Sequence, residues 1–149
     1  MTHTALDPVP VPVPRSGSVP RRLALAITVV AGAALLAASG VIHLHLWAAG
    51  YRHIPTIGPL FLAQGTAAVV MAVTVLSWRR MLVALAGAAL MVGTIAGFFA
   101  SLLIGLFGFH DTFAAPQATL ALIIEIAGAA ALLATAWLRV AAERQHRAI

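Results

Sequence analysis

The sequence predicts an all-α membrane protein, in which four transmembrane helices form an up-and-down antiparallel bundle. Hydrophobic residues make up 62% of the 149 positions and charged residues only 9%, whereas a soluble domain carries about 25% charged residues. The mean hydropathy of +1.01 agrees with a chain surrounded by lipid. Four apolar runs each supply the roughly 20 residues that a helix needs to cross a bilayer. The linkers between the runs are short, which favours antiparallel neighbours.

The N-terminal segment, residues 1–20, is predicted to be a disordered, Pro-rich cytoplasmic tail. It contains five of the eight prolines, mostly in a Val-Pro alternation. Such a segment favours an extended polyproline II conformation and does not form a helix. It lacks the short apolar core of a signal peptide, so we expect it to be retained. A spacer role and recognition by a proline-binding partner are the two interpretations.

The first two predicted helices span residues 23–48 and 58–78. Gly50 is placed to end the first helix, and Pro55 prevents easy continuation. Pro59 suits the first turn of the second helix, where a missing backbone N–H has no consequence. Each run is therefore delimited by residues that disfavour a helix interior.

The last two predicted helices span residues 81–109 and 115–138. The break between them contains a His-Asp-Thr sequence that interrupts the apolar run. Together the four helices form a predicted transmembrane domain of residues 21–140. Residues 141–149 are polar and are predicted to form a second cytoplasmic tail.

The distribution of arginine predicts the orientation of the bundle. Eight of the nine arginines lie in or directly beside the two tails and in the linker between the second and third helices, at Arg15, Arg21, Arg22, Arg79, Arg80, Arg139, Arg144 and Arg147. The other two linkers, residues 49–57 and 109–115, contain only Arg52. The positive-inside rule then places both termini in the cytoplasm and these two linkers outside. Because the arginines flank apolar runs and form no continuous basic face, nucleic acid is not an expected partner.

Three polar side chains, His43, Gln64 and Glu125, are expected to form a cluster in the outer half of the bundle. Glu125 is the only acidic residue within a predicted crossing, where a carboxylate costs about 2.5 kcal/mol or more. It lies about 13 Å along its helix from Pro116, close to the middle of the membrane. His43 shares a helical face with small residues, which indicates that it points inward. Gln64 enters from the same side to a similar depth.

Three interpretations of this cluster remain open. His43 and Glu125 satisfy each other as a structural pair, or they pass a proton, or they ligate a divalent metal such as zinc, copper or iron. Haem is poorly matched, because His110 is predicted at the membrane surface and His43 within it. Residues of the outer linkers are expected to cap the cluster: Tyr51, Arg52, His53, His110 and Asp111.

The third predicted helix carries small residues at strict four-residue spacing, which are Gly93, Gly97, Ser101 and Gly105. Small residues allow helix backbones to approach closely in lipid. We interpret this ridge as a packing surface within one chain, with a homodimer contact as the alternative.

Residues 43–64, HLHLWAAGYRHIPTIGPLFLAQ, resemble a recurring sequence in small bacterial membrane proteins with four predicted helices. Residues 110–128 provide a weaker second match. The resemblance implies a four-helix integral membrane protein. It implies no activity and no site residue. We expect this protein to lie in the bacterial cytoplasmic membrane.

The sequence contains no cysteine, no HExxH motif, no Gly-rich phosphate loop and no serine-nucleophile turn. We therefore expect a non-catalytic protein that acts as an accessory or assembly subunit of a membrane complex. Its expected partners are the lipid bilayer and either another membrane protein or a second copy. The alternative is a protein that binds a metal or haem, or couples transport to protons, through His43, Gln64 and Glu125. No cofactor is expected under the first interpretation.

Overall fold

The computed structural model describes residues 18–147, and this part of the chain contains four long helices. They are α1 (Ser18–Ala49), α2 (Ile57–Ser77), α3 (Met81–Leu103) and α4 (Ala118–Arg147), with a short 3-10 helix at Tyr51–His53. Each of the four is long and apolar enough to cross a membrane. The predicted all-helical fold with four membrane-length helices is therefore confirmed.

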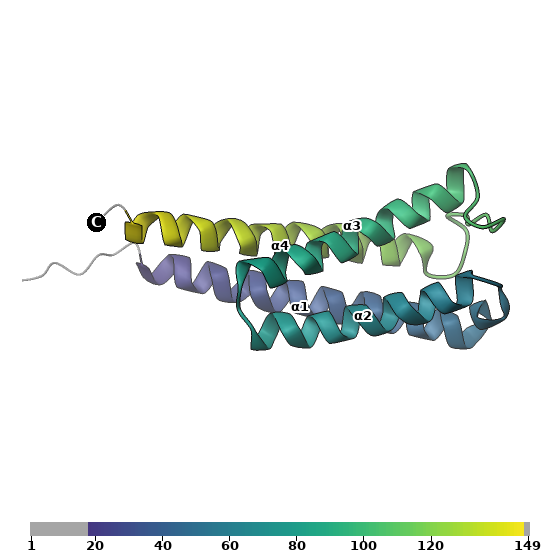
Figure 1. Ribbon diagram of the computed structural model, residues 1–149, viewed down its shortest axis with the longest axis horizontal. Helices are drawn as coiled ribbons and strands as arrows, with labels where there is room; N and C mark the ends of the chain where they lie inside the picture. The colour runs from purple at the N-terminus through teal and green to yellow at the C-terminus, as the bar shows by residue number, and fades with distance from the viewer. Residues whose placement is uncertain (1–17, 148–149) are drawn as a thin grey trace, which may run out of the picture.

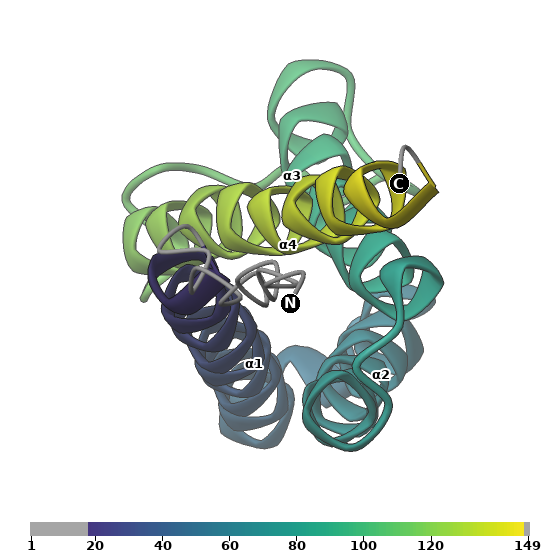
Figure 2. The ribbon, with the colours of Figure 1, turned by 90° about the vertical axis from the view of Figure 1, so that its left-hand side faces the viewer.

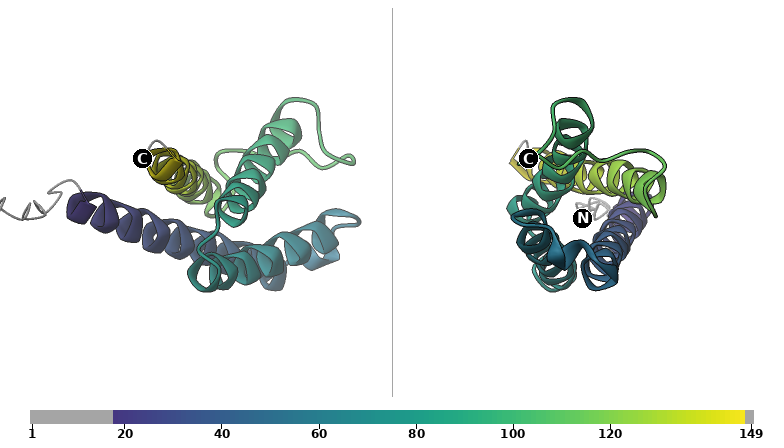
Figure 3. Two further views of the ribbon diagram at one scale, coloured as in Figure 1. Left: turned by 60° about the vertical axis from the view of Figure 1, so that its left-hand side comes forward. Right: turned by 90° about the vertical axis from the view of Figure 1, so that its right-hand side faces the viewer.

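The helices run alternately up and down, so the start of α1 and the end of α4 lie at the same end of the molecule (Figure 1). Viewed along the long axis, the four helices surround a common centre (Figure 2). Leu36, Met91 and Leu132, from α1, α3 and α4, are fully buried there. We call the end with the connections 50–56 and 104–117 the loop end. Towards it, α3 diverges from α2 (Figures 1 and 3).

Helices α1 and α2 touch backbone to backbone at two glycines. A Cβ atom built on Gly40 would lie 2.9 Å from the carbonyl oxygen of Gly65, and one built on Gly65 would lie 3.0 Å from that of Gly40. Gly32 makes a similar approach to the Leu132 side chain of α4. Small residues therefore bring α1 close to its neighbours, as lipid-embedded helices require.

The predicted packing ridge on α3 has different surroundings. A Cβ atom on Gly93 or Gly97 would meet no atom within 4 Å, so no neighbouring helix packs against these two positions. Ser101 hydrogen-bonds to the following loop, and Gly105 lies beyond the end of α3. The interpretation of this ridge as a packing surface within one chain does not hold at Gly93 and Gly97. Contact with a second chain stays a prediction.

Helix α3 ends at Leu103 instead of continuing to 109 as predicted. Gly105, Phe107 and Gly108 have positive φ angles of 77°, 52° and 80°, which a right-handed helix excludes. Leu106 and Phe109 exchange two backbone hydrogen bonds, of 2.8 and 2.9 Å. The segment is thus a tight hairpin turn, in which two consecutive residues of positive φ are typical. Because most side chains of this segment are apolar, the sequence did not indicate a turn here.

The other boundaries also shift. Helix α1 begins at Ser18, five residues before the predicted start, because Pro20 is acceptable in a first turn. Helix α4 begins at Ala118 and continues to Arg147, so residues 141–147 of the predicted C-terminal tail are helical. This extension contains good helix formers and neither glycine nor proline. Residues 1–17 of the predicted N-terminal tail lie outside the described residues.

Candidate functional site

A cavity of about 530 Å³ lies between α2 and α3, on the side of the bundle towards the loop end. Its walls are mostly apolar, and the residues that leave it open are the small ones on the two facing helices. These are Ala63 and Ala67 of α2 and Ala89, Gly93 and Gly97 of α3. The cavity exists because α2 and α3 diverge while neither helix carries bulky side chains at these positions.

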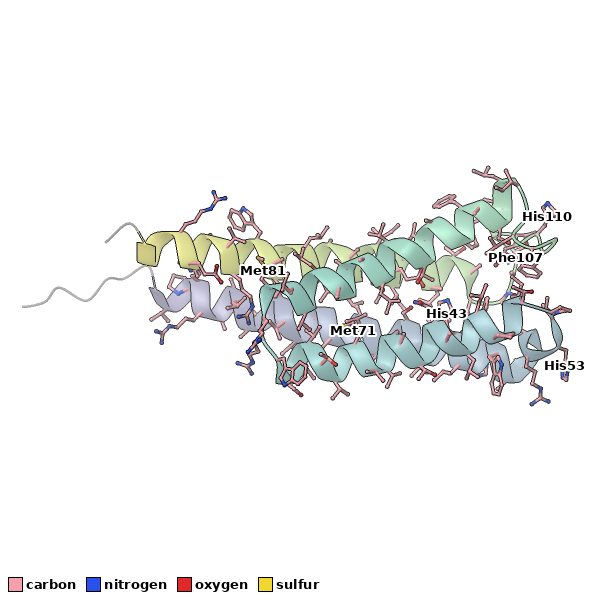
Figure 4. All side chains as sticks on the ribbon, in the orientation of Figure 1. His43, His53, Met71, Met81, Phe107 and His110 are labelled. Atoms are coloured by element: carbon pink, nitrogen blue, oxygen red, sulfur yellow. The ribbon has the colours of Figure 1, made fainter. Side chains whose placement is uncertain are left out.

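The polar floor of the cavity is formed by α1 and α4. His43 Nε2 lies 3.8 Å from Glu125 Oε1, slightly beyond hydrogen-bond distance. The Ser39 hydroxyl donates a hydrogen bond of 3.1 Å to the same carboxyl oxygen. Ser39 is 0% exposed, Glu125 2% and His43 7%, so water reaches none of them freely. The sequence prediction that His43 points inward towards Glu125 agrees with this geometry, and Figure 4 places His43 inside the bundle.

The hydrogen bond of the other imidazole nitrogen fixes the tautomer of His43. His43 Nδ1 lies 2.9 Å from the backbone carbonyl oxygen of Ser39, which can only accept, so Nδ1 carries a proton and donates it. Nε2 then faces Glu125. One proton shared between Nε2 and the carboxyl group would make the pair neutral overall. A neutral pair is far cheaper to bury than a lone carboxylate.

Gln64 reaches the same cavity from α2. Its Nε2 atom is buried and has no hydrogen-bond partner among the described residues. The three residues of the predicted cluster therefore all line one cavity, but Gln64 bonds to neither His43 nor Glu125. A buried amide donor without a partner is unusual. It belongs to a residue that lines a space large enough for a ligand.

Sequence reasoning missed the role of Ser39. It lies one helical turn before His43 on the same face of α1. A hydroxyl on the face of an inward-pointing histidine was the available signal, because both must be satisfied within the bundle.

Aromatic rings close the cavity towards the loop end. Tyr51 stacks on Phe61, with ring centroids 4.6 Å apart, and meets Phe109 edge-on at 5.9 Å. The Ser101 hydroxyl fastens the loop by donating to the Phe109 carbonyl oxygen and accepting from the Asp111 backbone N–H, both at 3.0 Å. Tyr51 and Asp111 line the cavity. Burial, and secondarily the negative charge of Asp111, raise the pKa of the Tyr51 phenol.

The other predicted capping residues lie elsewhere. Arg52 and His53 are exposed and hydrogen-bonded to each other, with Arg52 Nε 3.0 Å from His53 Nε2. The exposed His110 packs its ring over Gly105. Figure 4 shows both His53 and His110 at the outer limit of the loop end, away from His43. The predicted cap is thus made by two of its five members together with Phe61 and Phe109.

The residues present do not fit a tightly held metal ion. Among the side chains that the structure describes, no group of three or more His, Cys, Asp or Glu comes together, whereas protein zinc sites use three or four such ligands. His43 and Glu125 alone supply two. For haem, His43 is the one histidine that lines the cavity, and His45, exposed on another face of α1, does not join it.

Comparison with protein-family models, curated proteins and solved structures found no match.

Proposed function

We propose that this chain is a non-catalytic, multi-pass membrane protein that binds a small and largely apolar molecule in the cavity between α2 and α3. The observation that carries the proposal is the combination of about 530 Å³ of mostly apolar space with the polar residues His43, Gln64 and Glu125 in its lining, one of which, Gln64, has a buried Nε2 atom without a partner among the described residues. Ligand cavities are usually of this size, with apolar walls and a few polar groups that fix orientation.

The lining indicates what kind of molecule would fit. A hydrogen-bond acceptor, such as a carbonyl or hydroxyl oxygen, would satisfy the Gln64 amide. A donor placed near the floor would bond to Glu125, which already accepts from Ser39. The rings of Tyr51 and Phe61 favour a flat, ring-bearing body.

The ligand would enter from the lipid. Ala63 and Ala67 of α2 and Ala89 of α3 line the cavity and are also exposed on the surface of the bundle. The opening therefore lies between two helices, in the part of the surface that acyl chains would cover. An apolar molecule dissolved in the membrane reaches such an opening without crossing water.

Binding is better supported than a proton path across the bundle. Beyond Glu125, the centre of the bundle is filled by the fully buried Leu36, Met91 and Leu132. These side chains carry no group that could pass a proton onward. Proton exchange between His43 and Glu125, whose nearest nitrogen and oxygen atoms lie 3.8 Å apart, is a second candidate confined to the cavity. A role as an accessory subunit stays a prediction from composition.

We propose further that the protein lies in the bacterial cytoplasmic membrane with both termini in the cytoplasm. The support is the gathering of Arg22, Arg79 and Arg139 at the end opposite the loop end. The cavity then belongs to the outer half of the membrane.

A fluorescent apolar probe tests the binding function. The probe 1-aminoanthracene is a fused aromatic amine whose emission rises in apolar cavities. We expect saturable binding to the purified protein in lipid nanodiscs, and loss of saturable binding in Gly97→Leu, whose side chain would fill the cavity.

The matched control is Ala96→Leu, which adds the same bulk one residue earlier, at an exposed position outside the cavity lining. It should bind the probe like the unchanged protein. Equal binding by Gly97→Leu and Ala96→Leu would overturn the proposed cavity function.

A further inference from the structure

A second hollow, of about 280 Å³, lies at the end of the bundle opposite the loop end. Three arginines from separate elements line it: Arg22 from α1, Arg79 from the α2–α3 turn and Arg139 from α4. They are 57 and 60 residues apart in sequence (22 to 79 and 79 to 139). The fold brings them to one place where the start of α1 and the end of α4 lie together (Figure 1).

These three guanidinium groups have little compensation from the described carboxylates. None of the three lies within 4 Å of the carboxyl group of Asp111, Glu125 or Glu143. Glu143, one turn after Arg139 on α4, attracts it without a direct ion pair. Arg139 Nε is buried and has no hydrogen-bond partner in the described part of the chain. An anion or another strong acceptor in the hollow would satisfy this donor.

The rest of the hollow is an apolar wall on α1, formed by Leu25, Ala26, Val29 and Val30. Val30 is 59% exposed, so this wall continues outward onto the surface that would face lipid. The site thus combines a cationic end with an apolar groove. A free inorganic anion would use only the first of these.

We propose that this hollow binds an anionic phospholipid, with its phosphate held by Arg22, Arg79 and Arg139 and an acyl chain lying against the α1 wall. Arginine suits a phosphate because its planar group donates two parallel hydrogen bonds to phosphate oxygens. Basic pockets between helices on the cytoplasmic side are a recognised way of holding lipid headgroups. The proposal is independent of the cavity at the loop end.

Native mass spectrometry of the full chain tests it. The detergent-solubilised protein is given an equimolar mixture of phosphatidylglycerol and phosphatidylcholine with identical acyl chains. We expect phosphatidylglycerol to be retained preferentially, and Arg139→Gln to lower this preference about fivefold, the change that corresponds to about 1 kcal/mol per arginine. Arg80→Gln is the matched control, because Arg80 follows Arg79 but does not line the hollow, and it should leave the preference unchanged.

A second variant separates a lipid from a soluble anion. Ala26→Phe fills the apolar groove and keeps every charge, so it should also lower lipid retention. Added inorganic phosphate should not displace phosphatidylglycerol. If millimolar inorganic phosphate displaces it, or if Ala26→Phe retains lipid normally, the site does not hold a lipid. Unchanged preference in both Arg139→Gln and Arg22→Gln, each with native helix content by circular dichroism, would overturn the proposal altogether.

Discussion

At the scale of single residues, the floor of the cavity is a pre-formed polar group of three side chains. Ser39 donates to Glu125, and the backbone carbonyl of Ser39 fixes the ring of His43. These contacts connect α1 and α4 at the floor of the cavity, so the Glu125 carboxyl group is positioned before any ligand binds. Positioning of this kind lowers the ordering cost of binding.

Glu125→Gln should weaken probe binding with little change in shape. The carboxyl group is the strongest acceptor at the floor, and a hydrogen bond to a charged group contributes about 1.5–3 kcal/mol. We expect the affinity for 1-aminoanthracene to fall about tenfold or more, measured by fluorescence titration. Glu143→Gln, at an exposed position of α4, should have no effect. Equal titration curves for Glu125→Gln and the unchanged protein would contradict the role of this residue.

Gln64→Leu should stabilise the ligand-free protein while weakening the binding of a ligand that accepts a hydrogen bond. The buried amide has no partner, and such a group costs about 1–3 kcal/mol. Thermal unfolding in detergent should therefore shift to higher temperature. Thr66→Val, at an exposed position of α2, removes a polar group that is not buried and should leave the unfolding temperature nearly unchanged. Destabilisation by Gln64→Leu would mean that the amide is satisfied within the protein.

Tyr51 allows a direct test of the environment of the cap, because it is the single tyrosine of the chain. Its pKa is raised above 10.0 by burial and by Asp111, so tyrosinate absorbance should appear at higher pH than in the unfolded chain. The folded state favours the neutral phenol. This contribution to stability is complete below the unfolded pKa and is lost as the pH rises through the folded pKa. Asp111→Asn should move the titration of Tyr51 to lower pH. A titration at the ordinary value of a free tyrosine would contradict the burial of the ring.

At the scale of helices, glycine has two opposite roles in this bundle. In α1 and α2, Gly40 and Gly65 allow the backbones to touch. In α3, Gly93 and Gly97 leave space that no other part of the chain fills. The first pair is a packing device, and the second forms one wall of the cavity.

Alanine substitution should separate these roles. Gly65→Ala places a methyl group 3.0 Å from the Gly40 carbonyl oxygen and should destabilise the bundle by about 1–3 kcal/mol, as overpacking does. Gly93→Ala meets nothing and improves helix propensity, so it should stabilise α3 by about 1 kcal/mol. Thermal unfolding of the two variants in one detergent provides the comparison. Equal destabilisation by both would mean that α3 packs against another helix at Gly93.

Sequence reasoning worked well for the helices and less well for their surroundings. Apolar length predicted all four helices because the requirement to cross a membrane is strict. The apolar pattern also predicted that α3 ends at 109, which is wrong. Phe107 and Phe109 continue the pattern through a turn whose geometry depends on positive φ angles. The spacing of Gly93 and Gly97 indicated that one face of the α3 backbone is not covered by its own side chains. It did not indicate whether a helix or an open space lies against it, because that depends on residues distant in sequence.

At the scale of the whole molecule, the bundle has a filled centre and a larger cavity towards the loop end. All four helices contribute to this centre, α2 through Ala72 and Val75, whereas α2 and α3 separate towards the loop end (Figure 3). Helical facing did predict that His43 and Glu125 point inward. The opening beside them was not predictable, because it arises from the divergence of two helices that the sequence only indicates to be neighbours.

The orientation in the membrane is testable because the chain contains no cysteine. Single cysteines introduced as His53→Cys, in the first connection of the loop end, and Arg80→Cys, in the α2–α3 turn, can be labelled with a membrane-impermeant maleimide. In intact cells the first should react and the second should react only after permeabilisation. The reverse pattern would invert the proposed topology and place the cavity in the cytoplasmic half.

The central claim is that a small apolar molecule occupies the cavity between α2 and α3, and photolabelling tests it most directly. The photoreactive analogue 1-azidoanthracene is irradiated with the protein in nanodiscs, and the labelled residues are identified by peptide mass spectrometry. We predict that the label concentrates on lining residues of both helices, such as Phe61, Gln64 and Phe98, and that Gly97→Leu abolishes this labelling. Labelling spread over the lipid-facing surfaces of all four helices, and unchanged by Gly97→Leu, would contradict the claim.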